Sequence, residues 1–158
     1  MLEVGDSPSD FVLTDDRGEE VRWEDLRGSP VVVFFYPKAS TPGCTTEACD
    51  FRDLQAEFAA RNVRVFGASA DSVKRQSNFR DKHTLSMPLL SDPDHVILEP
   101  WGVWAEKKNY GKTYMGIVRS TFVFDERGTL AHKWTNVRVK GHADKVLARV
   151  DELFGQEN

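Results

Sequence analysis

The chain has only two cysteines in 158 residues, and no apolar run in it is long enough to cross a bilayer. Residues 1–6 also lack the basic and apolar regions of a signal peptide. We therefore expect a cytoplasmic protein with no membrane partner. In a reducing compartment, a close cysteine pair is more often catalytic or redox-sensing than a structural disulfide.

The chain also lacks an excess of basic residues. Its 21 Lys and Arg are outnumbered by 25 Asp and Glu, which gives a formal net charge of −4 and an isoelectric point near 5.6. This balance argues against nucleic acid or an anionic membrane as the main partner. No linker or repeat divides the chain, and its length fits a single domain over residues 1–158.

Both cysteines lie in a predicted helix that directly follows a predicted buried strand. Residues 31–36 form a continuous apolar run, which is typical of a central strand covered on both faces. Thr41 is a good N-cap, and Pro42 suits the first helical position because the amide hydrogen it lacks would be unpaired there. Cys44 therefore falls in the first turn, where free amides and the helix dipole favour a thiolate.

One side of this helix is predicted to face the core. At about 100° per residue, a single stripe is formed by Cys44, Glu47, Phe51, Leu54 and Phe58. Cys49 lies about 140° round the helix from Cys44 and about 7.5 Å further along it, beyond the usual span of a disulfide. If these two cysteines form a disulfide, the first helical turns must unwind.

The rest of the pattern predicts an α/β fold. A strand at 63–69 follows the helix, so strand, helix and strand give a right-handed parallel crossover. Hairpins are predicted at 11–23 and 119–134, with glycine-containing turns at 15–18 and 125–128. Further expected elements are a helix from the Ser72 cap to about residue 83, a short strand at 88–90, a brief helix from Asp94 to Leu98, an irregular loop at 105–118 and a final helix at 143–154.

This order of elements is that of a thioredoxin-like fold. We expect a central mixed sheet flanked by helices, with the first hairpin as an N-terminal β-hairpin extension.

The residues around Cys44 resemble the active-site signature of the peroxiredoxins. Pro37, Thr41 and Cys44 are followed by Glu47 and by a second cysteine at position 49. This five-residue cysteine spacing is similar to the bacterioferritin comigratory protein, or Q-type, subfamily. The resemblance extends through residues 67–72, 88–92, 102–104 and 119–122, so it covers nearly the whole chain and implies the same thioredoxin-like fold.

The resemblance implies a thiol-dependent peroxidase acting on hydrogen peroxide and organic hydroperoxides. Cys44 would be the peroxidatic nucleophile, leaving a sulfenic acid that Cys49 resolves as an intramolecular disulfide. The cycle would close with reduction by thioredoxin or a similar dithiol protein. No metal, flavin or haem cofactor is required, and the chain is expected to be a monomer or weak dimer.

Four further residues are expected to support Cys44. Thr41 would accept a hydrogen bond from a helix amide while donating to sulfur or peroxide, and Pro37 would shield the thiolate from water. Arg119 is the cation that the resemblance places near the sulfur. Glu47, on the inward stripe, needs a partner to be tolerated there, and Arg119 is the natural candidate.

Each of these residues also has a simpler interpretation. A cysteine on an apolar stripe is commonly a small buried hydrophobe. Thr41 would then be an N-cap only, Pro37 a chain turn, and Arg119 a solvated residue at a strand start. Gln76, where many members of the subfamily carry a histidine, is a departure that we expect to affect the surface helix and not the chemistry.

A zinc site is the alternative that the two cysteines and four histidines raise. The cysteines occupy different helix faces, so they would not bind one zinc ion together. The four histidines do not have the spacing of zinc ligands; they are His83, His95, His132 and His142. We therefore treat the histidines as ordinary.

Two other functions would use the same cysteines. A thiol–disulfide oxidoreductase normally carries Cys-x-x-Cys, which this chain lacks, so insulin reduction is expected to be negligible. A redox sensor would react with peroxide stoichiometrically and signal to a partner through the unwinding helix. A steady-state assay separates it from a peroxidase.

Overall fold

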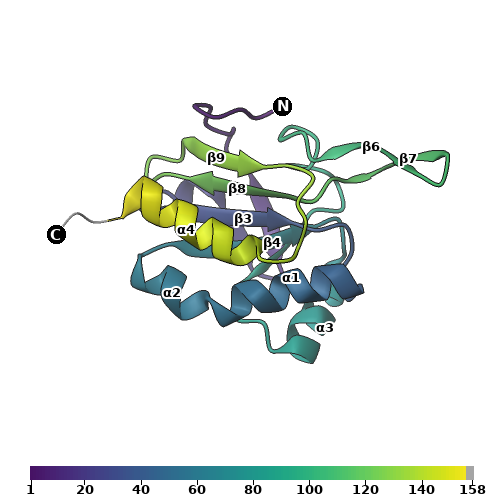
Figure 1. The fold of residues 1–158 in the computed structure, drawn as a ribbon, viewed down its shortest axis with the longest axis horizontal. Coiled ribbons are helices and arrows are strands. Elements are labelled where there is room, and N and C mark those ends of the chain that lie inside the picture. Colours follow the sequence, from purple (N-terminus) through teal and green to yellow (C-terminus); the bar gives the residue numbers. More distant parts are fainter. Residues whose placement is uncertain (156–158) are drawn as a thin grey trace.

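The computed structural model describes residues 1–155, which form a seven-stranded mixed sheet packed against helices and turns (Figure 1). The strand order is β2-β1-β5-β4-β3-β8-β9. In chain order these strands are β1 (Val12–Asp15), β2 (Glu20–Arg22), β3 (Val31–Phe35), β4 (Arg64–Ser69), β5 (Leu89–Ser91), β8 (Ser120–Phe124) and β9 (Leu130–Trp134). The three central strands β3, β4 and β5 are parallel, and the outer strands pair antiparallel with their neighbours.

The central strand β3 is buried on both faces, as its apolar run predicts. Val31, Val33 and Phe35 belong to one hydrophobic cluster, whereas Val32 and Phe34 belong to another. The second cluster takes in side chains of the four α-helices, α1 (Pro42–Asp53), α2 (Gln55–Ala60), α3 (Val73–His83) and α4 (His142–Phe154). The first lies under the N-terminal hairpin, the short 3-10 helix η1 (Trp23–Asp25) and residues 97–103.

Several predicted elements are confirmed. β3, α1 and β4 form the parallel crossover, and both predicted hairpins are present. Their turns carry Gly18 and Gly128 at φ of 77° and 82°, which glycine adopts without steric cost. The Ser72 hydroxyl caps α3 by accepting from the Arg75 amide at 3.2 Å.

Residues 105–118 are not an irregular loop, so that prediction is wrong. They lie in a hairpin of β6 (Trp104–Asn109) and β7 (Lys112–Ile117), which forms a separate two-stranded sheet and projects from the body (Figure 1). Tyr110 and Gly111 connect its strands with φ of 52° and 76°, as a two-residue type I′ turn requires. The lysine-rich strands lack the apolar alternation by which a strand is recognised.

The brief helix expected from Asp94 to Leu98 is also absent, and residues 93–94 and 96–102 form turns instead. The carboxylate of Asp92 accepts hydrogen bonds from the amides of Val96, Ile97 and Leu98, at 2.6, 2.9 and 3.0 Å. An aspartate that takes up successive amides in this way offers the backbone an alternative to helical bonding. Within residues 1–155, no helix has the length and hydrophobicity needed to cross a bilayer.

Candidate active site

Cys44 lies where the cap chemistry predicts, in the first turn of α1. Thr41 is the N-cap residue, with extended backbone angles of −81° and 156°, and Pro42 is the first helical residue. The turn sits just beyond the carboxyl end of β3, and Cys44 is only 1% exposed. Its sulfur therefore faces the interior, between the helix and the sheet.

Arg119 reaches this sulfur from the neighbouring strand. β8 pairs antiparallel with β3, with Ser120 opposite Phe35, so the start of β8 lies beside the end of β3. From the residue before β8, Arg119 Nη2 donates to Cys44 Sγ at 3.3 Å. A guanidinium carries donors only, so the sulfur is the acceptor.

Glu47 holds the other side of the same guanidinium, as predicted. It lies one turn after Cys44, is 1% exposed, and accepts from Arg119 Nη1 at 2.5 Å through Oε1. Its second oxygen, Oε2, is buried with no hydrogen-bond partner. Burial raises the pKa of Glu47 to about 7, although the Arg119 guanidinium acts in the opposite direction.

Arg119 remains a cation in this setting. Burial lowers the pKa of Arg119, but Glu47 and Cys44 more than compensate, and the net pKa lies above the ordinary value. The buried pair with Glu47 therefore fixes a charged guanidinium against the sulfur. The simpler interpretation of Arg119 as a solvated residue is excluded by these contacts.

Cys49 lies on the same uninterrupted helix but not beside Cys44. It is half-buried at the edge of the helix-side cluster, whereas Cys44 lies inside that cluster. Both cysteines are free thiols. As the helical geometry predicts, the two residues project in different directions while α1 is intact.

Thr41 and Pro37 are near the site, but their contacts differ from those expected. The Thr41 hydroxyl donates to the Lys38 carbonyl at 2.8 Å and makes no cap bond to a helix amide, so that part of the prediction is wrong. Its predicted contact with sulfur or peroxide would need the hydroxyl to turn away from Lys38. Pro37 follows β3 and is half-buried, and its role as a shield stays a prediction.

A buried polar cluster that the sequence did not reveal fixes the segment leading into α1. The carboxylate of Asp71, through Oδ2, accepts from the Ala39 amide and the Ser69 hydroxyl, both at 2.7 Å. Ala39 precedes the helix, whereas Asp71 follows β4, so these bonds tie the approach to α1 to the second central strand. A separation of 32 residues leaves no local signal for such a bond.

Gln76 belongs to this cluster, so the expectation that it affects only a surface helix is wrong. Its side chain is fully buried and donates to Ser69 Oγ at 3.0 Å and the Leu90 carbonyl at 2.8 Å. Its oxygen accepts from the Tyr36 hydroxyl at 2.5 Å. Burial raises the pKa of Tyr36 well above its usual value, so this hydroxyl stays a donor.

His142 is a second buried residue that sequence reasoning passed over. Its Nε2 lies 2.8 Å from the Thr121 hydroxyl, and its ring packs edge-on against Phe51 of α1. Burial, followed by the charges of Lys145 and Arg119, lowers the pKa of His142 to about 4. The ring is therefore neutral at pH 7. Among residues 1–155, no three His, Cys, Asp or Glu side chains are grouped to hold a metal ion.

A cavity of about 560 Å³ opens beside the segment that leads into α1. It is bounded by Pro37 and Lys38, by residues 70–72 before α3 and Arg75 within it, and by residues of the β6–β7 hairpin. This hairpin therefore stands next to the candidate active site.

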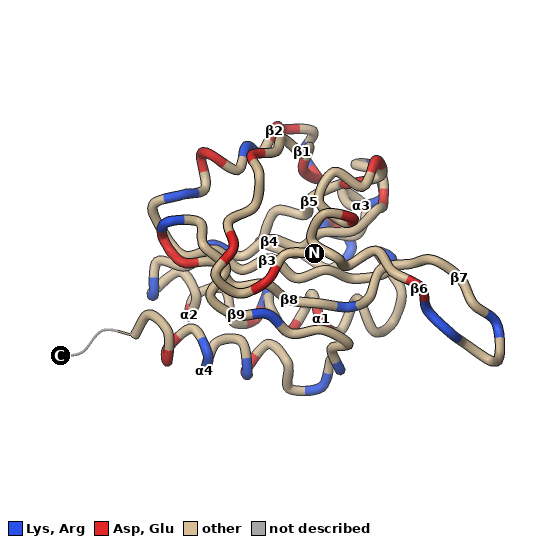
Figure 2. The backbone as a smooth tube through the Cα atoms, turned by 90° about the horizontal axis from the view of Figure 1, so that it is seen from above, with Lys and Arg blue, Asp and Glu red and all other residues tan. Residues whose placement is uncertain are grey.

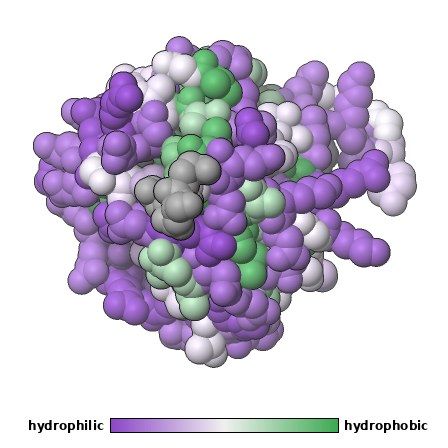
Figure 3. Space-filling model, turned by 60° about the vertical axis from the view of Figure 1, so that its left-hand side comes forward, coloured by the Kyte–Doolittle hydropathy of each residue, from purple (hydrophilic) through white to green (hydrophobic). Residues whose placement is uncertain are grey.

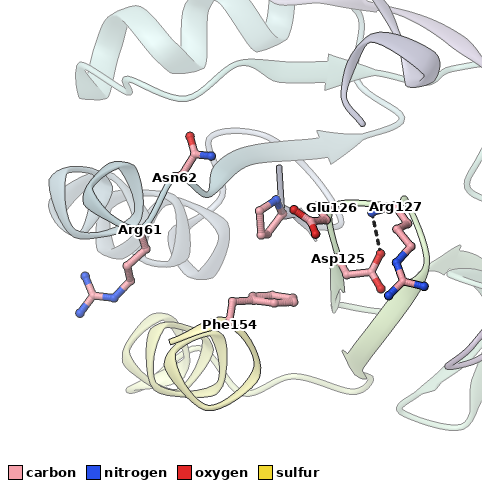
Figure 4. A pocket seen from close by; sticks show the side chains of 7 residues that line it. Arg61, Asn62, Asp125, Glu126, Arg127 and Phe154 are labelled. Atoms are coloured by element: carbon pink, nitrogen blue, oxygen red, sulfur yellow. Dashed lines mark hydrogen bonds between the residues drawn. The ribbon is translucent and has the colours of Figure 1, made fainter. Parts of the chain in front are cut away.

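A second cavity, of about 350 Å³, lies at the opposite edge of the sheet (Figure 4). Phe154 projects into it from α4 toward the turn that carries Asp125 and Glu126, whereas the Arg61 side chain points away and pairs with Asp151. The surrounding face is mainly hydrophilic, with a narrow hydrophobic band (Figure 3). No cysteine is among the residues that line this cavity. Cys44 and Arg119 lie at the opposite edge of the sheet, beyond the carboxyl end of β3.

Comparison with known proteins gives consistent similarities. The sequence profile of the AhpC/TSA family matches residues 4–133. The chain is 44% identical over 152 residues to peroxiredoxin Bcp of Bacillus subtilis, covering 96% of this chain and 97% of the relative. It is also 44% identical over 146 residues to peroxiredoxin Bcp of Escherichia coli, covering 92% and 94%.

Solved structures show the same likeness. The Xanthomonas campestris bacterioferritin comigratory protein, studied for alkyl peroxide reduction, superposes with a TM-score of 0.88 at 38% identity, covering 97% of this chain and 98% of the other. A Cys-to-Ser mutant of Xylella fastidiosa PrxQ gives 0.93 at 32% identity with the same coverage. These likenesses confirm the predicted thioredoxin-like fold.

Proposed function

Since the chain belongs to the AhpC/TSA family and is a peroxiredoxin-type thiol peroxidase, we propose that Cys44 is its peroxidatic residue and Cys49 its resolving residue. The substrates are hydrogen peroxide and organic hydroperoxides. The observation that carries this assignment is the contact of Arg119 Nη2 with Cys44 Sγ at 3.3 Å.

The first step is attack of the Cys44 thiolate on the nearer peroxide oxygen. A sulfur–oxygen bond forms as the oxygen–oxygen bond breaks, and the leaving alkoxide or hydroxide takes a proton and departs as alcohol or water. Negative charge spreads over both oxygens during this displacement. Arg119 is a fixed cation at that point, and its bond to Glu47 spares the site from reorienting it as charge develops.

The second step uses Cys49. Its thiol attacks the sulfur of the Cys44 sulfenic acid, the disulfide forms, and the hydroxyl leaves as water. Because both residues lie on the intact helix α1, residues 44–49 must unwind first. Glu47 lies between the cysteines, so its pair with Arg119 is broken in the same movement. A dithiol protein, thioredoxin or a similar one, then reduces the disulfide.

Replacement of Cys44 by Ser tests the first step. Thioredoxin-dependent peroxide consumption should fall to background, because a serine hydroxyl is not ionised at neutral pH and cannot act as the nucleophile. Steady-state peroxide loss is the measurement, with a circular dichroism spectrum to show that the variant is folded. Normal turnover by this variant would rule the mechanism out.

Replacement of Cys49 by Ser tests the second step. The variant should complete one turnover and then accumulate Cys44 sulfinic acid under excess peroxide, because nothing resolves the sulfenic acid. Intact mass spectrometry after peroxide titration reports this directly. A mass spectrum that shows no sulfinic Cys44 under excess peroxide would count against the resolving role of Cys49, and a Cys44 left unmodified would contradict its role as the peroxidatic residue.

A further inference from the structure

We propose that the β6–β7 hairpin is the docking surface for the reductant, and that the reductant is an acidic dithiol protein. This inference rests on the proposed function, because it concerns the step in which the Cys44–Cys49 disulfide is reduced. It adds a partner class and a surface to that step.

The hairpin is a basic element on an acidic chain. Residues 104–117 contain three lysines, Lys107, Lys108 and Lys112, against one acidic residue, Glu106, whereas the whole chain has a formal net charge of −4. Figure 2 shows β6 and β7 as an arm that extends away from the body, with blue Lys and Arg segments along it. Opposite charge on a partner steers its approach and orients it on such an arm.

The same arm exposes large apolar side chains. Tyr110 at the turn is 97% exposed, Met115 is 53% exposed and Tyr114 is 47% exposed. Aromatic residues and methionine are enriched in protein interfaces, and lysine-bearing rims around them provide specificity. A two-stranded hairpin without further strand partners is only marginally stable in water, so β6 and β7 are better explained as a recognition element than as a structural support.

The arm also stands at the right place. Lys107 and Tyr114 bound the same 560 Å³ cavity as Pro37 and Lys38, which lead directly into the cysteine-bearing helix. Lys38 lines the same cavity and adds a positive charge beside the arm, whereas Arg75, also in the lining, lies 3.8 Å from the Asp71 carboxylate. A partner held by the arm would therefore reach the first turns of α1, where the disulfide becomes accessible after unwinding.

The test compares two charge-reversal pairs that change the net charge equally. Lys108→Glu with Lys112→Glu alters the arm. Arg17→Glu with Arg127→Glu alters the turns of the two other hairpins, which lie at the opposite edge of the sheet because β1 and β8 run antiparallel to β5 and β3. All four residues are exposed.

Each variant is first oxidised with peroxide and then reduced, by stopped flow, either with a thioredoxin of net negative charge or with dithiothreitol. We expect the arm pair to lower the second-order rate constant with thioredoxin about tenfold at low salt and to reduce its salt dependence. The rate with dithiothreitol and the behaviour of the control pair should not change. Tyr110→Ser, which keeps the charges, should lower the thioredoxin rate alone.

Equal losses in the arm and control pairs would overturn the docking proposal, as would an unchanged rate in the arm variants. A change in self-association on analytical ultracentrifugation, without a change in the thioredoxin rate, would make the arm a contact between copies and also overturn it. If the wild-type chain consumed no peroxide with dithiothreitol as reductant, the proposed peroxidase function itself would be refuted. That outcome is distinct from failure of the docking proposal.

Discussion

Two buried carboxylates flank the cysteine-bearing turn, and they are satisfied to different extents. Asp71 accepts two hydrogen bonds, from the Ala39 amide and the Ser69 hydroxyl, and lies outside the segment between the cysteines. Glu47 lies inside that segment, binds Arg119 through one oxygen and leaves the other without a partner. Asp71 is therefore held through Oδ2 by two residues, with Arg75 3.8 Å from its Oδ1, whereas Glu47 is held by Arg119 alone.

The difference suggests a division of labour around α1. The Asp71 cluster connects the approach to the helix with β4 and does not need to change when residues 44–49 unwind. In the proposed cycle, the Glu47 pair positions the Arg119 guanidinium while α1 is folded and must be released for Cys49 to reach Cys44. A buried carboxylate with an unsatisfied oxygen lowers the free energy needed for that release, because unwinding returns it to water.

The largest effect is expected from Arg119→Met, because Arg119 is the group that links Glu47 to the reacting sulfur. Loss of a fixed charge at a developing anion typically lowers the rate about 100- to 1000-fold, and we expect that loss in kcat/KM for peroxide. The initial rate of Cys44 oxidation in a single turnover is the measurement. Arg119→Lys keeps the positive charge but cannot contact Glu47 and Cys44 at the same time. Its kcat/KM should lie between those of wild type and Arg119→Met.

A rate for Arg119→Met within a few-fold of wild type would show that the guanidinium only pairs with Glu47. In that case the two carboxylates would both be structural, and the contrast between them would lose its functional content.

Asp71→Ala should act mainly on stability. Removing the carboxylate leaves the Ala39 amide and the Ser69 hydroxyl without their buried acceptor, which should lower the free energy of unfolding by about 3 kcal/mol. Urea denaturation measures this loss. Asp71→Asn keeps one acceptor oxygen and should lose less, and Asp94→Ala, at an exposed aspartate, should change the free energy by less than about 0.5 kcal/mol.

If Asp71→Ala slowed Cys44 oxidation as strongly as Arg119→Met without lowering stability, the cluster would belong to the chemistry. Asp71 would then be the carboxylate with a role in the reaction.

The sequence predicted most of the site because its signals are local. Thr41 and Pro42 mark the start of α1, and the helical stripe places Cys44 and Glu47 inward. The family resemblance, and not a local pattern, is what predicts Arg119 near the sulfur, and the antiparallel pairing of β8 with β3 explains how it comes to lie there. The register between β3 and β8 then leaves Arg119 within reach of both side chains. The helix start and the inward stripe follow from capping and periodicity, which a sequence records, whereas the register between β3 and β8 is known only from the structure.

The remaining features depend on contacts between distant residues or on backbone preferences with no apolar pattern. The Asp71–Ala39 and Tyr36–Gln76 bonds join residues 32 and 40 positions apart. The β6–β7 hairpin is specified by a type I′ turn in a lysine-rich stretch. The Thr41 hydroxyl donates to the Lys38 carbonyl and makes no bond to a helix amide. None of these features produces a periodic pattern in the sequence from which it could be predicted.

The smallest expected effect is a pH dependence of stability that originates at Glu47. With a pKa of about 7 in the folded state, against about 4.5 in the unfolded chain, the folded state holds a proton between those values that the unfolded state has released. The stabilisation is complete below pH 4.5 and is lost as pH rises through 7. We expect the loss between pH 5 and pH 8 to be about 2 to 3 kcal/mol.

His142 obscures this loss in the wild-type curve, because its pKa of about 4 lies below the unfolded value of 6.5. Its contribution runs the other way, since stability falls as pH drops from 6.5 toward 4. The measurement is therefore the difference between wild type and Glu47→Gln in the free energy of unfolding, from urea denaturation at pH 5, 6, 7 and 8. His142 is present in both proteins, so its contribution cancels. The free energy of unfolding of wild type minus that of Glu47→Gln should fall by about 2 to 3 kcal/mol from pH 5 to pH 8. A difference that stays constant with pH would mean that Glu47 is ionised throughout, and that its release from Arg119 gains nothing from deprotonation.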